Sequence, residues 1–141
     1  MEEFVTRIKV RGYHTDFYGH VNNARYLEFY EENRWCWFDR VPNLTEWAKK
    51  GLTFAVVNIN INYRQAIVLG AMIEVRGRIE KIGSRSVTMR QEIILVDSGA
   101  LASDALVTFV IIGKDGAAVN MKSSDREEVR NFVSMLSDTS G

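Results

Sequence analysis

The sequence has little of what disulfide, metal or serine-based chemistry requires. It contains one cysteine, Cys36, and two histidines among its 141 residues. A single cysteine excludes an internal disulfide and a metal site built on several cysteines, and no group of histidines and carboxylates has the spacing of metal ligands. The chain also lacks a Gly-x-Ser-x-Gly nucleophile elbow and the glycine-rich loops that bind phosphates. We therefore expect neither a metal nor another cofactor, and no serine mechanism.

An excess of charge and a long apolar run are missing as well. Eighteen basic and eighteen acidic residues cancel, so the net charge does not favour nucleic acid or an anionic membrane as a partner. The longest apolar runs, such as residues 107–112, are far shorter than the roughly 20 residues that span a bilayer. The acidic start of the chain does not resemble a secretory signal. We expect a single cytoplasmic domain over residues 1–141, a common domain size, with no nucleic-acid or membrane partner.

Alternating apolar and polar residues predict most of the chain to be strands. The alternating segments are residues 4–10, 54–63, 72–82, 86–96 and 100–112. Short turns at residues 83–85 and 97–99 predict antiparallel neighbours for the last three strands. In residues 54–63, strict alternation predicts that Phe54 lies on the face of Asn58, opposite Ile59.

A helical period replaces the alternation from Asn22 to about Asp39. Six apolar side chains gather on one side at about 100° per residue: Tyr26, Leu27, Tyr30, Trp37, Phe38 and Val41. Asn33 and Arg34 fall on the same side, and a buried arginine needs a carboxylate or carbonyl partner, for which Glu31 is close in sequence. Asn22 or Asn23 is the expected N-cap.

Two shorter helices complete the pattern. Residues 43–50 predict a helix that is capped by Asn43 or Thr45 and ends at Gly51. Residues 124–127 form a capping box before a one-sided apolar stripe from Val129 to Leu136. The order predicts an α+β fold in which a long helix packs in a curved sheet of about five antiparallel strands, with a sheet edge or face available for dimerisation.

A candidate site lies where the first strand gives way to the long helix. Asp16, His20, Asn22 and Asn23 fall within eight residues there. A helix N-terminus presents unpaired N–H groups and a partial positive charge, which stabilise negative charge developing on an oxygen. The residues alone indicate acyl transfer, with Asp16 as base or nucleophile and helix N–H groups as oxyanion donors; a turn-forming role for Asp16 is the structural alternative.

This segment, residues 13–26, resembles the signature of hotdog-fold acyl-CoA thioesterases of the 4-hydroxybenzoyl-CoA thioesterase-like branch, with its Gly-His-Val-Asn-Asn motif at residues 19–23. Residues 56–64 resemble most closely the bacterial long-chain acyl-CoA thioesterases of that branch. The resemblance implies a hotdog subunit whose long central helix is wrapped by a five-stranded antiparallel sheet, plus a C-terminal helix. It also implies a homodimer, commonly two dimers in a homotetramer, with the acyl chain at the dimer interface.

The resemblance implies hydrolysis of acyl-CoA to a free carboxylic acid and coenzyme A, as in fatty acid metabolism. Asp16 matches the residue that attacks the thioester carbonyl or activates water, and the Asn23 backbone N–H matches the group that polarises that carbonyl. His20 is the third catalytic candidate. The acidic residue usual two positions before the catalytic aspartate is His14 here, which predicts a different hydrogen-bond partner for the turn.

Residues for binding the substrate are predicted at three places. Tyr18 and Asn22 belong to the signature segment, and Asn58 lies on a strand that is expected at a subunit interface. Cations or N–H donors would hold the phosphates of coenzyme A; the candidates are Arg64 and three residues of a basic hairpin, Lys81, Arg85 and Ser86. Two alternatives remain open: a hotdog dehydratase acting on 3-hydroxyacyl thioesters, and a non-catalytic acyl-CoA binding module.

Overall fold

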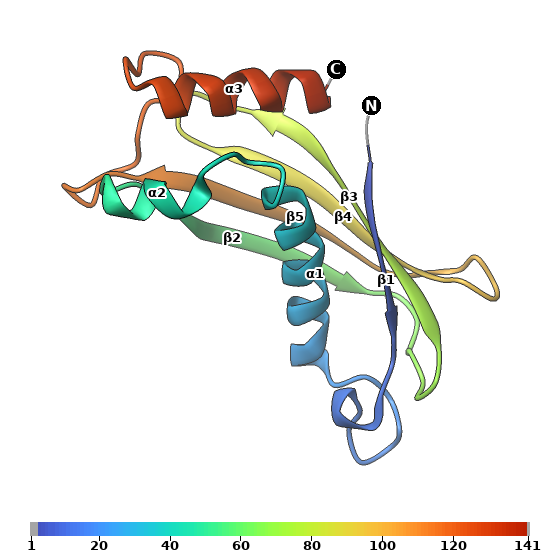
Figure 1. Cartoon of the computed structure of the whole chain (residues 1–141). Helices are drawn as coiled ribbons and strands as arrows, with labels where there is room; N and C mark the ends of the chain where they lie inside the picture. The colour runs from blue at the N-terminus through green and yellow to red at the C-terminus, as the bar shows by residue number, and fades with distance from the viewer. Residues whose placement is uncertain (1–2, 141) are drawn as a thin grey trace.

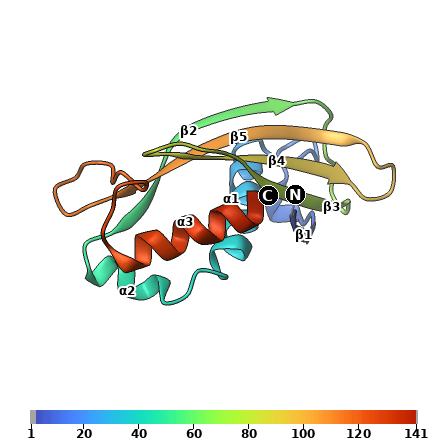
Figure 2. The ribbon, with the colours of Figure 1, turned by 90° about the horizontal axis from the view of Figure 1, so that it is seen from above.

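The computed structural model describes residues 3–140, which form one antiparallel sheet with the helices on one face (Figures 1 and 2). In chain order the elements are β1 (Phe4–Lys9), the 3-10 helix η1 (Gly12–His14), α1 (Asn23–Phe38), α2 (Leu44–Lys49), β2 (Thr53–Tyr63), β3 (Met72–Ile82), β4 (Val87–Leu95), β5 (Leu101–Ile112) and α3 (Glu127–Ser140). The strands lie in the order β1-β3-β4-β5-β2, and all neighbours are antiparallel. The predicted α+β class and the element order are confirmed.

Helix α1 begins and ends where the sequence predicts. Asn22 is the N-cap, and its side chain accepts a hydrogen bond from the Ala24 N–H. Tyr26, Tyr30 and Trp37 are buried against the sheet. Leu27 departs from the prediction because it is 41% exposed: it lies on the flank of the helix that turns away from the sheet centre.

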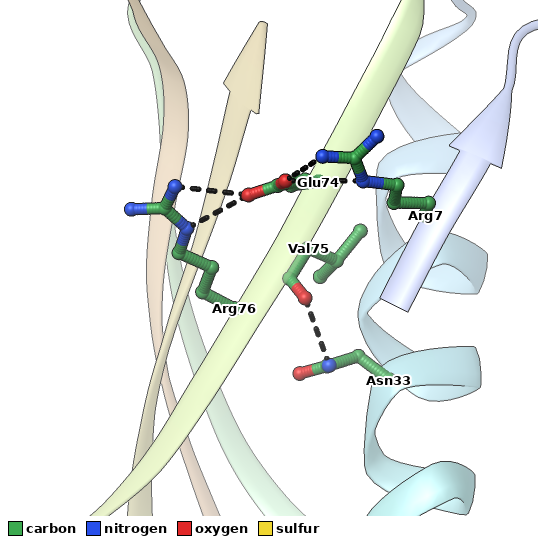
Figure 3. A network of polar contacts seen from close by, with 5 residues as sticks. All are labelled: Arg7, Asn33, Glu74, Val75 and Arg76. Atoms are coloured by element: carbon green, nitrogen blue, oxygen red, sulfur yellow. Dashed lines mark hydrogen bonds and ion pairs between the residues drawn. The ribbon is translucent and has the colours of Figure 1, made fainter. Parts of the chain in front are cut away.

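A buried polar layer divides the core into two apolar clusters. The Asn33 side chain donates to the backbone oxygens of Phe4 and Val75, each at 3.0 Å, and Figure 3 shows it reaching from α1 to β3. Gln91 on β4 donates to Asn33 Oδ1 at 2.8 Å. A Cβ on Gly77 would lie 2.6 Å from that same Oδ1. The absence of a side chain at Gly77 therefore allows α1 to approach the sheet closely.

Arg34 has a carbonyl hydrogen-bond partner, as its burial requires. Its guanidinium donates to the side-chain oxygen of Gln91 at 3.1 Å. Burial lowers the pKa of Arg34, and the negative charge of Glu31 raises it again in part. Glu31 thus acts on Arg34 through its charge, while Gln91 supplies the hydrogen bond.

One prediction for strand β2 was wrong: Phe54 and Asn58 do not share a face. A β-bulge between Val56 and Asn58 shifts the register against β5, and one extra residue reverses the alternation. Phe54 pairs with Ile111 and Ile59 with Val107, both of which belong to the buried face of β5. Phe54 and Ile59 therefore share the inner face, and Asn58 lies on the outer face instead of beside Phe54.

The two shorter helices form as predicted, but their caps differ from the prediction. Asn43, the residue before α2, has a left-handed backbone with φ of 57° and makes no side-chain cap hydrogen bond. The other predicted cap, Thr45, lies inside α2, which begins at Leu44. Gly51, with φ of 78°, ends this turn as predicted.

Glu127 is the first residue of α3, and Ser124 Oγ accepts from the Arg126 N–H at 3.2 Å, so the predicted capping box is not formed within the described residues. In α3, Val129 and Leu136 are buried, and the helix packs on β3.

The outer face of the sheet is covered by ion pairs. Glu74 on β3 accepts from Arg7 on one side and from Arg76 on the other, at 2.8 and 2.9 Å (Figure 3). Both guanidinium groups hold the pKa of the Glu74 carboxyl below its usual value, with Arg76 the larger influence. The outer face of the sheet is therefore largely polar, and the helices make their apolar contacts on the inner face.

Candidate active site

A short loop between η1 and α1 holds the predicted catalytic carboxylate. Its base is closed by an antiparallel bridge between Thr15 and Val21 and by the Asp16 N–H, which donates to the His20 carbonyl at 2.7 Å. Gly19 supplies the turn with φ of 75°, a conformation that favours glycine. The loop lies at the start of α1, at the bottom of Figure 1.

The two oxygens of the Asp16 carboxylate differ in their surroundings. Oδ1 accepts hydrogen bonds from the backbone N–H groups of Tyr18 and His20, at 2.8 and 3.2 Å. No group in the described residues 3–140 donates to Oδ2, and the side chain is exposed. Asp16 thus makes the Asx-type turn that was the structural alternative, and still presents one oxygen for chemistry.

The first turn of α1 presents a backbone donor. Asn22 Oδ1 accepts from the Ala24 N–H at 3.0 Å, and the Asn22 N–H itself donates to the His14 carbonyl at 2.9 Å. Within the part of the chain that the structure describes, the Asn23 N–H donates no hydrogen bond. That N–H lies at the positive end of the helix dipole, where an oxyanion is stabilised.

Tyr63, the last residue of β2, is a neighbour of this site that sequence reasoning missed. Its hydroxyl donates to the Asn23 carbonyl at 3.2 Å, and its ring packs edge-on against Tyr26 with centroids 4.8 Å apart. Burial raises the pKa of Tyr26, and Tyr63 adds to the rise. The contact joins positions 40 residues apart in sequence, so no local pattern could have indicated it.

Exposed aromatic rings surround the loop. Phe17 is 94% exposed and Tyr18 79%, and their rings contact each other edge-on at 5.5 Å. Tyr13 is also exposed. Large apolar groups that are clustered and exposed mark contact surfaces. Tyr18, a predicted substrate-binding residue, therefore lies in an aromatic surface next to Asp16.

Two further predicted binding residues lie on strand β2 or directly after it. Asn58 pairs with Thr108 on the outer face of the sheet, opposite α1. Arg64 follows Tyr63 and is ion-paired with Asp104, whose pKa its hydrogen bond lowers.

The basic hairpin lies at the far end of the sheet. It joins β3 to β4, next to α3 in Figure 1. The other end of β3, at Met72, is the one beside the end of β1 that leads into the Asp16 loop. Ten residues of strand at about 3.3 Å each separate the two ends, roughly 33 Å. Within one chain, the structure does not bring Lys81, Arg85 and Ser86 to Asp16.

Helix α1 and strand β2 lie side by side and run in opposite directions, because Tyr63 contacts Tyr26 and Phe54 contacts Phe38 at the other end, with ring centroids 4.8 Å apart in both pairs. A pocket of about 320 Å³ lies between α1, α2 and β2, at the end of α1 away from the loop. Its lining is largely apolar and includes Trp35, Phe38, Leu44, Trp47, Ala48 and Val56.

Among residues 3–140, no group of three or more histidine, cysteine, aspartate or glutamate side chains is placed to hold a metal ion. No helix in the described part of the chain has the length and apolar character needed to cross a bilayer.

A helix held by a curved antiparallel sheet, with a carboxylate loop at its start, is the arrangement expected of a hotdog-fold thioesterase. The chain belongs to the thioesterase-like superfamily, whose family model matches residues 10–133. It is 41% identical over 129 residues to the long-chain acyl-CoA thioesterase FadM of Escherichia coli strain K12, a match that covers 91% of this chain and 98% of that protein.

Solved structures agree with this family. The probable thioesterase YbaW from Escherichia coli is 40% identical, with a TM-score of 0.80 over 92% of this chain and 98% of that one. SAV2348 from Staphylococcus aureus, solved in complex with CoA, shares the fold with a TM-score of 0.83 at 15% identity, over 99% of this chain and 87% of that one. The predicted hotdog fold and the relationship to bacterial long-chain acyl-CoA thioesterases are confirmed, and the chain is an enzyme of the thioesterase class.

Proposed function

We propose that this protein hydrolyses acyl-CoA thioesters to a carboxylic acid and coenzyme A, with Asp16 as the catalytic carboxylate. The observation that carries the proposal is the unequal pair of oxygens on Asp16. Backbone N–H groups fix Oδ1, so the carboxylate has a set orientation before substrate binds. Oδ2 is the oxygen that attacks the thioester carbon or takes a proton from the attacking water.

Charge on the carbonyl oxygen is stabilised at the start of α1. As the C–O bond to the carbonyl carbon forms, the carbonyl oxygen becomes an oxyanion, and the Asn23 N–H and the helix dipole stabilise it. Collapse of the tetrahedral species breaks the C–S bond and releases coenzyme A as its thiolate. Where water attacked, the acid is formed directly and the proton held by Asp16 passes to the thiolate. Where Oδ2 attacked, water then hydrolyses the mixed anhydride, which releases the carboxylic acid and frees Asp16.

The Tyr63 hydroxyl donates to the carbonyl of Asn23 and so helps to fix the position of the residue whose N–H stabilises the oxyanion. His20 and Asn22 shape the loop and helix entrance on either side.

The position of the pocket suits a long acyl chain that runs along α1 from Asp16. From Asn23 to Phe38 the helix rises about 22 Å at roughly 1.5 Å per residue, and the apolar pocket occupies the far end of this path. Leu27 lies one turn before Glu31 on the same flank as the pocket residues. The Escherichia coli relative is named a long-chain acyl-CoA thioesterase. We therefore place the distal carbons of a long acyl chain in the pocket and the thioester at Asp16.

A second copy of the chain completes the site in this proposal. Strand β2 lies at a sheet edge, and Val57 and Ile59 on it are exposed; an apolar edge strand is a template for pairing with another strand. A dimer formed there would cover this side of α1 and the pocket beside it. Because the basic hairpin of the same chain is far from Asp16, the hairpin that binds the nucleotide phosphates belongs to another copy, in a dimer or a dimer of dimers.

Free-thiol release from a panel of acyl-CoAs tests the proposal. Release of coenzyme A from butyryl-, octanoyl- and palmitoyl-CoA, rising with chain length, is the expected result. Hydration or dehydration of 3-hydroxyacyl- or enoyl-CoA without thiol release would indicate the dehydratase. Saturable binding of palmitoyl-CoA without either reaction would indicate a non-catalytic binding module. Sedimentation equilibrium then tests for the dimer, whose absence would refute the shared site.

A further inference from the structure

His14 lies outside the groups assigned to the chemistry, yet its side chain anchors the catalytic loop. The ring is buried, with 8% exposure, between Tyr13 and Phe29 at centroid distances of 4.2 and 5.0 Å. Its Nδ1 atom accepts a hydrogen bond from the Arg11 N–H at 2.9 Å. A nitrogen that accepts carries no proton, so the imidazole is neutral in this arrangement.

The backbone around His14 connects this ring to both reacting groups. The His14 carbonyl accepts from the N–H of Asn22, the cap that precedes the Asn23 oxyanion donor. The next residue, Thr15, forms the bridge to Val21 that closes the Asp16 loop. Any displacement of the His14 turn therefore moves Asp16 and the start of α1 relative to each other.

We propose that neutral His14 is a positioning residue for thioester hydrolysis, and that its protonation switches the site off. The inference rests on the proposed function. A proton on Nδ1 would face the Arg11 N–H, and two donors 2.9 Å apart repel. The buried imidazolium would then have to leave its place between Tyr13 and Phe29, which would open the turn at the base of the loop.

The groups that face His14 favour the neutral form. Burial lowers the pKa of His14 most, and the positive charge of Arg25 lowers it further, as does that of Arg11 to a smaller extent; Glu28 on α1 opposes them. Arg25 and Glu28 are ion-paired at 2.8 Å, so their charges largely offset each other. The ordinary histidine value is 6.5; with the pKa below it, the site is assembled at neutral pH and is lost as the pH falls.

The pH dependence of kcat/KM for palmitoyl-CoA tests the switch in wild type and in His14→Asn. The Oδ1 atom of asparagine can replace Nδ1 as the acceptor, but it does not titrate. In wild type, we expect kcat/KM to fall about tenfold per pH unit below the pKa of His14. His14→Asn should keep most of the neutral activity and lack this decline. His14→Ala, which removes the acceptor, should lose activity at all pH values.

A measurement on wild type keeps the test independent of how the variants fold. The chain has two histidines, so NMR spectra of His20→Asn leave one imidazole signal and assign His14. The His14 titration midpoint should coincide with the acid decline of kcat/KM. A decline with the wild-type midpoint that persists in folded His14→Asn, or an NMR midpoint that differs from the kinetic one, would overturn the inference; loss of activity by protonation of Asp16 is common to both proteins and does not count. Wild-type turnover in Asp16→Asn would instead refute the proposed function.

Discussion

The Oδ1 atom of Asp16 lies 2.8 Å from the backbone nitrogen of Tyr18 and accepts its hydrogen bond. One carboxylate oxygen is therefore part of the loop's structure, while the other has no donor within residues 3–140. The proposed function gives this one side chain a structural and a chemical role. The two roles are separable, because an asparagine keeps an oxygen acceptor for the turn and loses the negative charge.

The pocket between α1, α2 and β2 predicts a chain-length effect. Ala48 lines this pocket from α2, and the larger side chain in Ala48→Phe would occupy part of it. Excluding about two methylenes, at roughly 0.8 kcal/mol each, corresponds to about tenfold in kcat/KM. We expect that loss with palmitoyl-CoA and almost none with butyryl-CoA. Thr45→Phe is the matched control, since Thr45 lies on the same helix and does not line the pocket; equal losses for both acyl chains would refute the placement.

Tyr63 offers a test of the oxyanion donor through its neighbour. Tyr63→Phe removes the hydroxyl that donates to the Asn23 carbonyl, so the first turn of α1 is held less firmly. A neutral hydrogen bond contributes about 0.5–1.5 kcal/mol, which corresponds to roughly two- to tenfold in kcat. Steady-state kinetics should show the loss in kcat rather than KM. Tyr13→Phe, an exposed tyrosine elsewhere on the same surface, serves as the comparison.

The close approach of α1 to β3 predicts a stability cost. In Gly77→Ala, the added Cβ would lie 2.4 Å from a ring carbon of Phe4 and 2.6 Å from Asn33 Oδ1. Overpacking of this kind costs about 1–3 kcal/mol in the free energy of unfolding, measured by urea denaturation. Gly12→Ala is the control because no atom lies within 4 Å of its added Cβ. An unchanged midpoint for Gly77→Ala would mean that the helix can shift without cost.

The structural features that depend only on residues close together in the sequence were predicted correctly. The period of residues 23–38 and the capping preference of asparagine are both local, so α1 and its Asn22 cap were predictable. The antiparallel strands followed from short turns. The polar positions Asn33 and Arg34 on an apolar helix face also indicated that partners must exist.

The partners themselves depend on the assembled fold. Gln91 is 57 residues from Arg34 in sequence, and nothing local marks it as the hydrogen-bond partner. Near Val56, apolar residues stand at both the odd and the even positions of the strand, so a one-residue shift in register does not interrupt the apolar–polar alternation. The bulge was therefore not predictable. The failed Asn43 cap has a similar cause: the tertiary path of the loop places its backbone in the left-handed region, where its side chain does not reach the helix.

The most direct test of the catalytic assignment is kcat for Asp16→Asn beside Asp16→Ala. Asparagine keeps the acceptor for the Tyr18 and His20 N–H groups, so Asp16→Asn should unfold at the wild-type urea concentration; Asp16→Ala should lose about 0.5–1.5 kcal/mol with those hydrogen bonds. Both should lower kcat for palmitoyl-CoA by about 10²–10⁴-fold, as expected for loss of a catalytic base. Wild-type kcat in a folded Asp16→Asn would show that the carboxylate only shapes the loop.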